Sequence, residues 1–292
     1  MKIKIIATAL ILPTLLSGCS FFGDSYKPSF SSKGEEVSKT TFENRMSNDY
    51  NEYKAFMNGN FPSLVATIKR KNVYSREEKS SKNKEVTKTY SSRLRDYTIK
   101  YDENTNCISY AQKYNDKEKG KTYDYMDVER ESKQSYDYLY QPSENKYNTA
   151  IVLIDKTEKL YYTYSITYEP DKTSRQMMAS FINGTDFEYY ISKINGYSDR
   201  RFYTNKNVYT ITVNSSRRYD TQKIETVATA QFSYKNGNYT VKYSNVSTTT
   251  TLQSGGDKDI SVETEYYTAT VKAKNISVKP VDLSKYTRTD SN

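Results

Sequence analysis

A period of two in the apolar residues constrains the fold of this chain more than any other feature. Tyr97, Ile99 and Tyr101 share one face of an extended chain, and LYYTYSITY at 160–168 alternates in the same way. Side chains on a strand alternate between its two faces, and clean alternation is typical of antiparallel strands with one buried and one solvated face. The pattern recurs over 61–168 and 208–278 and predicts a mainly β protein.

Turn signals divide these stretches into strands. Asn236-Gly237, between two alternating runs, is the strongest hairpin signal in the chain, because both residues accept positive φ angles. The charged segments 116–121 and 155–159 also predict turns. A last pair of strands is expected from ISVETEYYTATVKA at 260–273 and NISVKP at 275–280.

One helix is expected before the strands, and two short helices are expected between the two β stretches. Thr40 and Glu43 fit a capping box, and apolar residues at helical spacing predict a helix over 41–58, ended by Asn58-Gly59. Two short helices are expected over 173–182 and 185–194, each after its own capping box. The expected fold is α+β, mainly β: a curved antiparallel sheet or half-open barrel, with the N-terminal helix and two short helices packed on it. Such a sheet is expected to curl over the helices to cover its apolar face. A β-sandwich, or two smaller β domains joined near Asp171, also fits the pattern.

The N-terminus has the parts of an export signal. Lys2 and Lys4 precede the apolar run 5–16, which is shorter than the roughly 20 residues a membrane-spanning helix needs. Small residues follow at Ser17-Gly18. Residues 1–18 are therefore interpreted as a cleaved signal peptide.

The four residues Leu16-Ser17-Gly18-Cys19 resemble the bacterial lipobox. The resemblance implies a lipoprotein: a diacylglyceryl group on the Cys19 thiol, cleavage before Cys19, and a fatty acid such as palmitate on the new amino group. Two or more acyl chains make a stable membrane anchor. The implied location is the outer leaflet of the plasma membrane in a Gram-positive-like cell, or the outer membrane in a Gram-negative cell. Residues 19–39, polar and poor in apolar groups, are expected to form a flexible tether, and 40–292 a single β domain.

The charge of the chain is basic. Removing Lys2 and Lys4 from the 44 basic residues leaves 42 against 35 acidic residues, a net charge of +7. The stretch Lys69–Lys100 is especially rich in lysine and arginine. A basic surface close to a membrane attracts anionic head groups or wall polymers. The alternative is an ordinary solvated strand face, and an exported chain is not expected to bind nucleic acid.

Enzyme chemistry finds little support in the composition. The chain has no histidine, which excludes the usual Ser-His-Asp and Cys-His systems and histidine metal sites. With Cys19 lipidated, Cys107 is the one remaining thiol, and its alternating context predicts a small buried strand residue. Asp124, Asp127 and Glu129 cluster on an expected strand and are interpreted as solubilising. The protein is predicted to be non-enzymatic, with no cofactor and no metal.

The element order also resembles the half-open barrel lipoproteins of the LolA and LppX kind. That resemblance implies a cavity for a lipid or other apolar ligand, with the short helices as an adaptable lid. The residues expected to line it are Met177, Met178, Phe181, Phe187 and Ile191. The alternative is a structural or interaction lipoprotein that grips a wall polymer, glycan or protein through basic and tyrosine-rich strand faces. The 31 tyrosines fit either function, because tyrosine favours strands and can serve both faces of a sheet.

Overall fold

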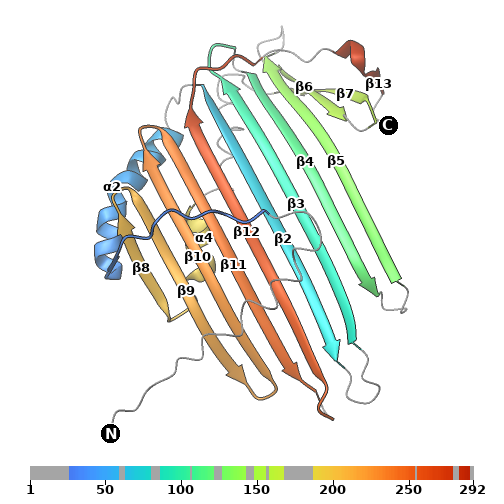
Figure 1. Cartoon of the computed structure of the whole chain (residues 1–292). Helices are drawn as coiled ribbons and strands as arrows, with labels where there is room; N and C mark the ends of the chain where they lie inside the picture. Colours follow the sequence, from blue (N-terminus) through green and yellow to red (C-terminus); the bar gives the residue numbers. More distant parts are fainter. Residues whose placement is uncertain are drawn as a thin grey trace.

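The computed structural model describes residues 26–58, 63–79, 86–105, 107–121, 127–142, 148–155, 158–167, 187–253, 255–278 and 283–289. Within these ranges the chain forms a single 13-stranded sheet and two α-helices (Figure 1). All neighbouring strands are antiparallel except β13 and β7. The prediction of a mainly β protein with a large antiparallel sheet and helices on it is confirmed.

The helices are α2 (Lys39–Asn58) and α4 (Phe187–Ile194), and a 3₁₀ turn covers Leu283–Lys285. The strands are β1 (Glu35–Val37), β2 (Leu64–Lys79), β3 (Val86–Asp102), β4 (Cys107–Lys121), β5 (Asp127–Pro142), β6 (Asn148–Asp155), β7 (Leu160–Thr167), β8 (Arg200–Asn205), β9 (Val208–Tyr219), β10 (Gln222–Lys235), β11 (Asn238–Leu252), β12 (Lys258–Ala273) and β13 (Thr287–Arg288).

The sheet is made of two meanders that join in its middle. Its order is β1-β8-β9-β10-β11-β12-β2-β3-β4-β5-β6-β7-β13. The last long strand, β12, pairs with the first long strand, β2, from Lys258↔Lys79 to Ala273↔Leu64. The two halves therefore belong to one continuous sheet, which stays open, with β1 and β13 at its ends.

The core lies between the sheet and the two helices. We call the face that α2 and α4 pack on the inner face and the opposite one the outer face. Phe232 of β10 sits at the centre of the core, with ring centroids 5.7 Å from Tyr50, 6.3 Å from Tyr53 and 5.4 Å from Phe187. Aromatic rings at such distances add to the stabilisation from burial. The stripe predicted for 41–58 thus faces the sheet.

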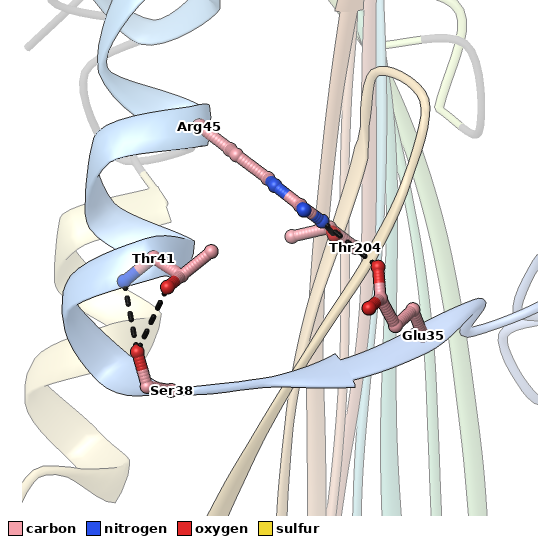
Figure 2. Close-up of polar contacts among 5 residues, drawn as sticks. All are labelled: Glu35, Ser38, Thr41, Arg45 and Thr204. Atoms are coloured by element: carbon pink, nitrogen blue, oxygen red, sulfur yellow. Dashed lines mark hydrogen bonds and ion pairs between the residues drawn. The ribbon is translucent and has the colours of Figure 1, made fainter.

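Helix α2 begins two residues earlier than its capping box indicates. Ser38, not Thr40, is the N-cap: its Oγ accepts a hydrogen bond from the Thr41 amide at 3.1 Å (Figure 2). The Phe42 amide bonds the Ser38 carbonyl at 2.9 Å. Strand β1 ends at Val37 and α2 begins at Lys39, so Ser38 is the residue between them and occupies the N-cap position. Figure 2 also shows Arg45 reaching from α2 to Glu35 of β1 and Thr204 of β8, at 3.1 and 2.7 Å.

The turn predictions have mixed outcomes. Asn236 and Gly237 join β10 to β11 with φ angles of 48° and 71°, so the hairpin is confirmed. The break at 155–159 separates β6 from β7, also as expected. The turn at 116–121 is wrong, because β4 runs through it: Lys117 and Lys119 pair with carboxylates on β5 instead of facing a loop. The pairing of 260–273 with 275–280 is also wrong, since β12 pairs with β11 and β2.

The long strands are buried at one end and partly exposed at the other. In β11, Tyr239, Val241 and Tyr243 are buried, while 245–251 are partly exposed on both faces. In Figure 1 the helices lie at one end of the sheet, and the long strands continue past them. The far ends carry mostly threonine, serine and charged residues, so they have no continuous apolar face that a second layer must cover. This composition explains why the sheet has not closed over the helices.

Candidate functional site

The expected apolar cavity is only partly within the described chain. Phe187 and Ile191 lie on α4, and three residues lie outside the described ranges, namely Met177, Met178 and Phe181. Phe187 is fully buried and stacks on Phe232. Ile191 is half-buried against the same core. The two placed residues are therefore part of the packed core.

A polar cluster holds the end of α4 on the sheet. Lys193 Nζ of α4 lies 2.6 Å from Glu265 Oε2, and Arg70 Nη2 of β2 lies 3.0 Å from Glu265 Oε1. The rings of Tyr190 and Tyr267 are 4.5 Å apart beside them, and burial raises the pKa of both phenols. These tyrosines stay neutral at physiological pH, and both carboxylate oxygens of Glu265 have cationic neighbours. The cluster is therefore suited to fixing α4, not to proton transfer.

Of the residues considered for enzyme chemistry, the structure places the side chains of Glu129 and Cys107. Asp124 lies outside the described residues, as does the side chain of Asp127, and Glu129 is an exposed residue paired with Lys119 at 3.4 Å. Cys107 opens β4 and is half-buried, and burial raises the pKa of its thiol. A raised pKa lowers the fraction of reactive thiolate at neutral pH. Cys19 lies outside the described residues.

Part of the expected tether lies on the outer face as an ordered strap, residues 26–34. Its hydrogen bonds join Tyr26 Oη to Thr268 Oγ1 at 2.7 Å, the Ser31 amide to Gln231 Oε1 at 3.0 Å, and Asn205 Nδ2 to the Ser32 carbonyl at 3.3 Å. Figure 1 shows this dark-blue segment crossing the front of the sheet as far as β12 and β2. This part of 19–39 thus differs from a free coil, because polar outer-face side chains satisfy its backbone groups.

Strand alternation separates the charged residues of β2–β5 and β8–β12 into two sets. Among the side chains that the structure places, the outer face carries the basic residues Lys69, Lys71, Lys79, Lys88, Lys100, Lys113, Lys117, Lys119, Lys133, Arg201, Arg218, Lys223, Lys235, Lys242, Lys258 and Lys272. Its acidic residues are Glu77, Asp96, Asp102, Glu129, Glu131 and Glu225. The outer face therefore has a large positive excess, and we call it the lysine face.

The inner face is nearly balanced in charge. Its placed basic residues are all arginines, namely Arg70, Arg76, Arg93, Arg95, Arg130, Arg200 and Arg217. Its acidic residues are Glu78, Asp116, Glu118, Asp259, Glu263 and Glu265. Several arginines use their planar group in paired contacts, such as Arg76 with both oxygens of Asp259 at 2.8 to 3.2 Å, and Arg95 with Asp116. Arginine suits such two-point pairs, whereas lysine is a hydrated point charge on a long stem.

A groove deepens the lysine face over β8, β9 and β10. Its volume is about 630 Å³, and its lining includes Lys33, Asp199, Arg200, Arg201 and Asn214. Lys33 of the strap lies over the Tyr203 ring, 5.3 Å from its centroid. Arg200 belongs to the inner face, so two basic side chains, Lys33 and Arg201, lie beside one acidic side chain, Asp199, and make this groove favourable for an anionic group.

In the described ranges, no group of three or more histidine, cysteine, aspartate or glutamate residues could hold a metal ion. No helix in that part of the chain is long and apolar enough to cross a bilayer.

Comparisons with known proteins add little. No protein-family model matches the sequence, and no curated protein matches it. Among solved structures, the chain aligns with a Pseudomonas aeruginosa FadL homologue at 6% identity, over 78% of this chain and 94% of that one, with a TM-score of 0.15. A TM-score this low carries no argument about fold or function.

Proposed function

We propose that this protein is a lipid-anchored lipoprotein of the bacterial cell envelope that binds an anionic partner through its lysine face. It is a non-enzymatic binding protein, exported and held by lipid on Cys19, at the outer leaflet of the plasma membrane or at an outer membrane. The single observation that carries the binding role is the separation of charge. Lysines gather on the outer face, while the inner face is close to neutral.

The charge separation is more specific than a basic composition alone. If the charges served only solubility, they would be expected on both faces of the strand ends that lie beyond the helices. Here the excess lies on one side, where exposed Lys88, Lys113 and Lys133 project from three neighbouring strands. Three carboxylates, Glu77, Asp96 and Glu131, pair with some of these lysines or their neighbours but leave the excess in place. A surface with one sign of charge concentrates partners of the opposite sign.

The competing proposal is a LolA- or LppX-like half-open barrel that holds an apolar ligand. It needs free volume beside α4, and the packing of Phe187 and Ile191 into the core favours the lysine face instead. Native mass spectrometry of the mature chain, before and after organic extraction, separates the two. An extractable mass of lipid size would support the apolar-ligand proposal.

A polyanion column tests the lysine face directly. The mature chain is applied to immobilised heparin and eluted with a salt gradient, beside Lys100→Gln/Lys113→Gln and the control Arg93→Gln/Arg130→Gln. All four residues are exposed and lie on β3, β4 or β5, and each pair loses two charges, from the outer and the inner face respectively. We expect the wild type and the control to elute together and the outer-face variant to elute earlier. Equal shifts for both variants would contradict a directed binding face.

A further inference from the structure

The strap fixes where the N-terminal anchor leaves the folded body. Tyr26, its first described residue, hydrogen-bonds Thr268 of β12 and the Lys69 carbonyl of β2. Lys69 Nζ also lies 5.1 Å from the centroid of the Tyr26 ring. Strands β12 and β2 are the middle of the sheet, far from β1 and β13 at its edges. The chain therefore reaches the body at the centre of the lysine face.

The length of chain before Tyr26 limits where the lipid can be. Cys19 and Tyr26 are seven residues apart, and a fully extended chain covers at most roughly 25 Å over that distance. To reach the inner side round β1 or β13, the chain before Tyr26 would have to cross at least five strands. Neighbouring strands are about 4.8 Å apart, so this path uses nearly all of the 25 Å. Passing round the nearer strand end, at Leu64, uses about 17 Å before the inner side is reached. About 8 Å then remain, so the Cys19 anchor can reach the outer side of the sheet and its rim, but not the helix-covered inner face.

We propose that the lysine face docks on the lipid bilayer that holds the Cys19 anchor, with anionic phospholipid head groups as its partner. This inference rests on the proposed function and names the partner of the same face. Lys113 lies two strands from Lys69 in the same cross-strand row, so its backbone is about 10 Å from the strap's end. Lysines beyond the strap, on β3, β4 and β5, are thus held beside the membrane surface by the anchor itself.

Two physical effects act together in this arrangement. The anchor keeps the face at high effective concentration next to the bilayer, so weak head-group contacts become populated. Lysine is suited to such contacts, because its long stem lets the charge reach head groups without one fixed geometry. The inner face, with its helices and balanced charge, is left facing away from the membrane.

Vesicle binding tests the partner without the anchor. The mature chain with Cys19→Ser is sedimented with vesicles of phosphatidylcholine alone or with phosphatidylglycerol added, at low and high salt. We expect binding to require phosphatidylglycerol and to fall with salt. Each lysine near an anionic membrane is worth roughly a fivefold change in partition, so Lys100→Gln/Lys113→Gln is expected to bind at least tenfold more weakly. Arg93→Gln/Arg130→Gln is expected to bind like the parent chain.

Lysine labelling of the lipidated protein tests the orientation. The full chain, processed and reconstituted in phosphatidylglycerol-containing vesicles, is treated with a membrane-impermeant amine reagent, and the same protein in detergent is the reference. We expect Lys113 and Lys133 to be protected several-fold on vesicles and Lys54, on α2, to react at the same rate in both. Equal reactivity of Lys113 on vesicles and in detergent would overturn the docking. Heparin binding without any vesicle binding would also overturn it, in favour of a wall polymer, while leaving the proposed function intact. If the protein bound neither heparin nor phosphatidylglycerol vesicles, both the proposed function and the membrane docking would be refuted.

Discussion

Val241 and Val246 lie on the same strand, β11, and offer a direct test of the change in packing along the sheet. Val241 is fully buried on the inner face, between Phe232 and Ala269 of the neighbouring strands. Val246 lies on the outer face, past the helix-covered end, and is partly exposed. We predict that Val241→Ala destabilises the protein much more than Val246→Ala.

The magnitude follows from the two methyl groups that each change removes. For Val241, lost burial costs about 1.6 kcal/mol, and the cavity left behind adds about 1 kcal/mol if the core does not collapse. Val246→Ala leaves no cavity and loses only part of the burial, so the free energy of unfolding is expected to fall by less than about 1 kcal/mol. Both changes lower strand propensity by a similar amount, because both sit within the same strand. The expected difference is therefore about 1.5–2 kcal/mol.

Urea unfolding, followed by far-ultraviolet circular dichroism and tyrosine fluorescence, measures both variants against the parent chain. The free energies of unfolding are compared at equal slopes, which keeps the comparison within one unfolding transition. A difference smaller than about 0.5 kcal/mol would refute the reasoning. It would mean that the two ends of β11 are packed alike, and that the helices do not create a separate core.

Three other predictions concern the N-terminal part of the fold. Ser38→Ala removes the N-cap of α2 and is expected to cost about 1 kcal/mol in urea unfolding, whereas Thr40→Ala, inside the helix, changes stability by less than about 0.5 kcal/mol. Gly34 has φ +80°, and a Cβ there would lie 2.3 Å from the Thr204 carbonyl oxygen, so Gly34→Ala is expected to free the strap and speed tryptic cleavage after Lys33. Gly255→Ala, at φ +96° with nothing within 4 Å, leaves that cleavage rate unchanged. Burial raises the pKa of Tyr26 to about 12, above its ordinary value of 10, so the folded chain favours the neutral phenol. The stability from this residue is complete below pH 10 and lost as pH rises toward 12. Tyr26→Phe is therefore expected to reduce the loss of stability that urea unfolding measures between pH 10 and pH 12.

Local patterns predicted those parts of the fold that local chemistry controls. Alternation identified the strand around Ile99 and Tyr101, both now buried on the inner face, because a period of two places them on one side whatever strand lies next to them. Asn236-Gly237 predicted its hairpin because both residues accept the positive φ angles of the turn. The helical spacing of Phe42, Tyr50 and Tyr53 likewise predicted one apolar stripe, because that spacing places them on one side of a helix. The turn predicted at 116–121 is wrong because lysine and glutamate are typical of solvated loops, whereas cross-strand ion pairs keep Lys117 and Lys119 in β4.

The sequence by itself therefore determined the mainly β pattern, the hairpin at Asn236-Gly237 and the helical stripe, and it showed that the chain is basic. Only the tertiary structure decided that β12 pairs with β2, which places the first long strand in the middle of one sheet. It also decided that the strap crosses the outer face, through contacts such as Ser31 with Gln231, 200 residues apart. Alternation sorts side chains into two sets but does not say which set a helix or strap will cover. Which face the helices cover and which face the strap crosses depends on long-range pairing. The same pairing aligns the lysines of separate strands on one basic face.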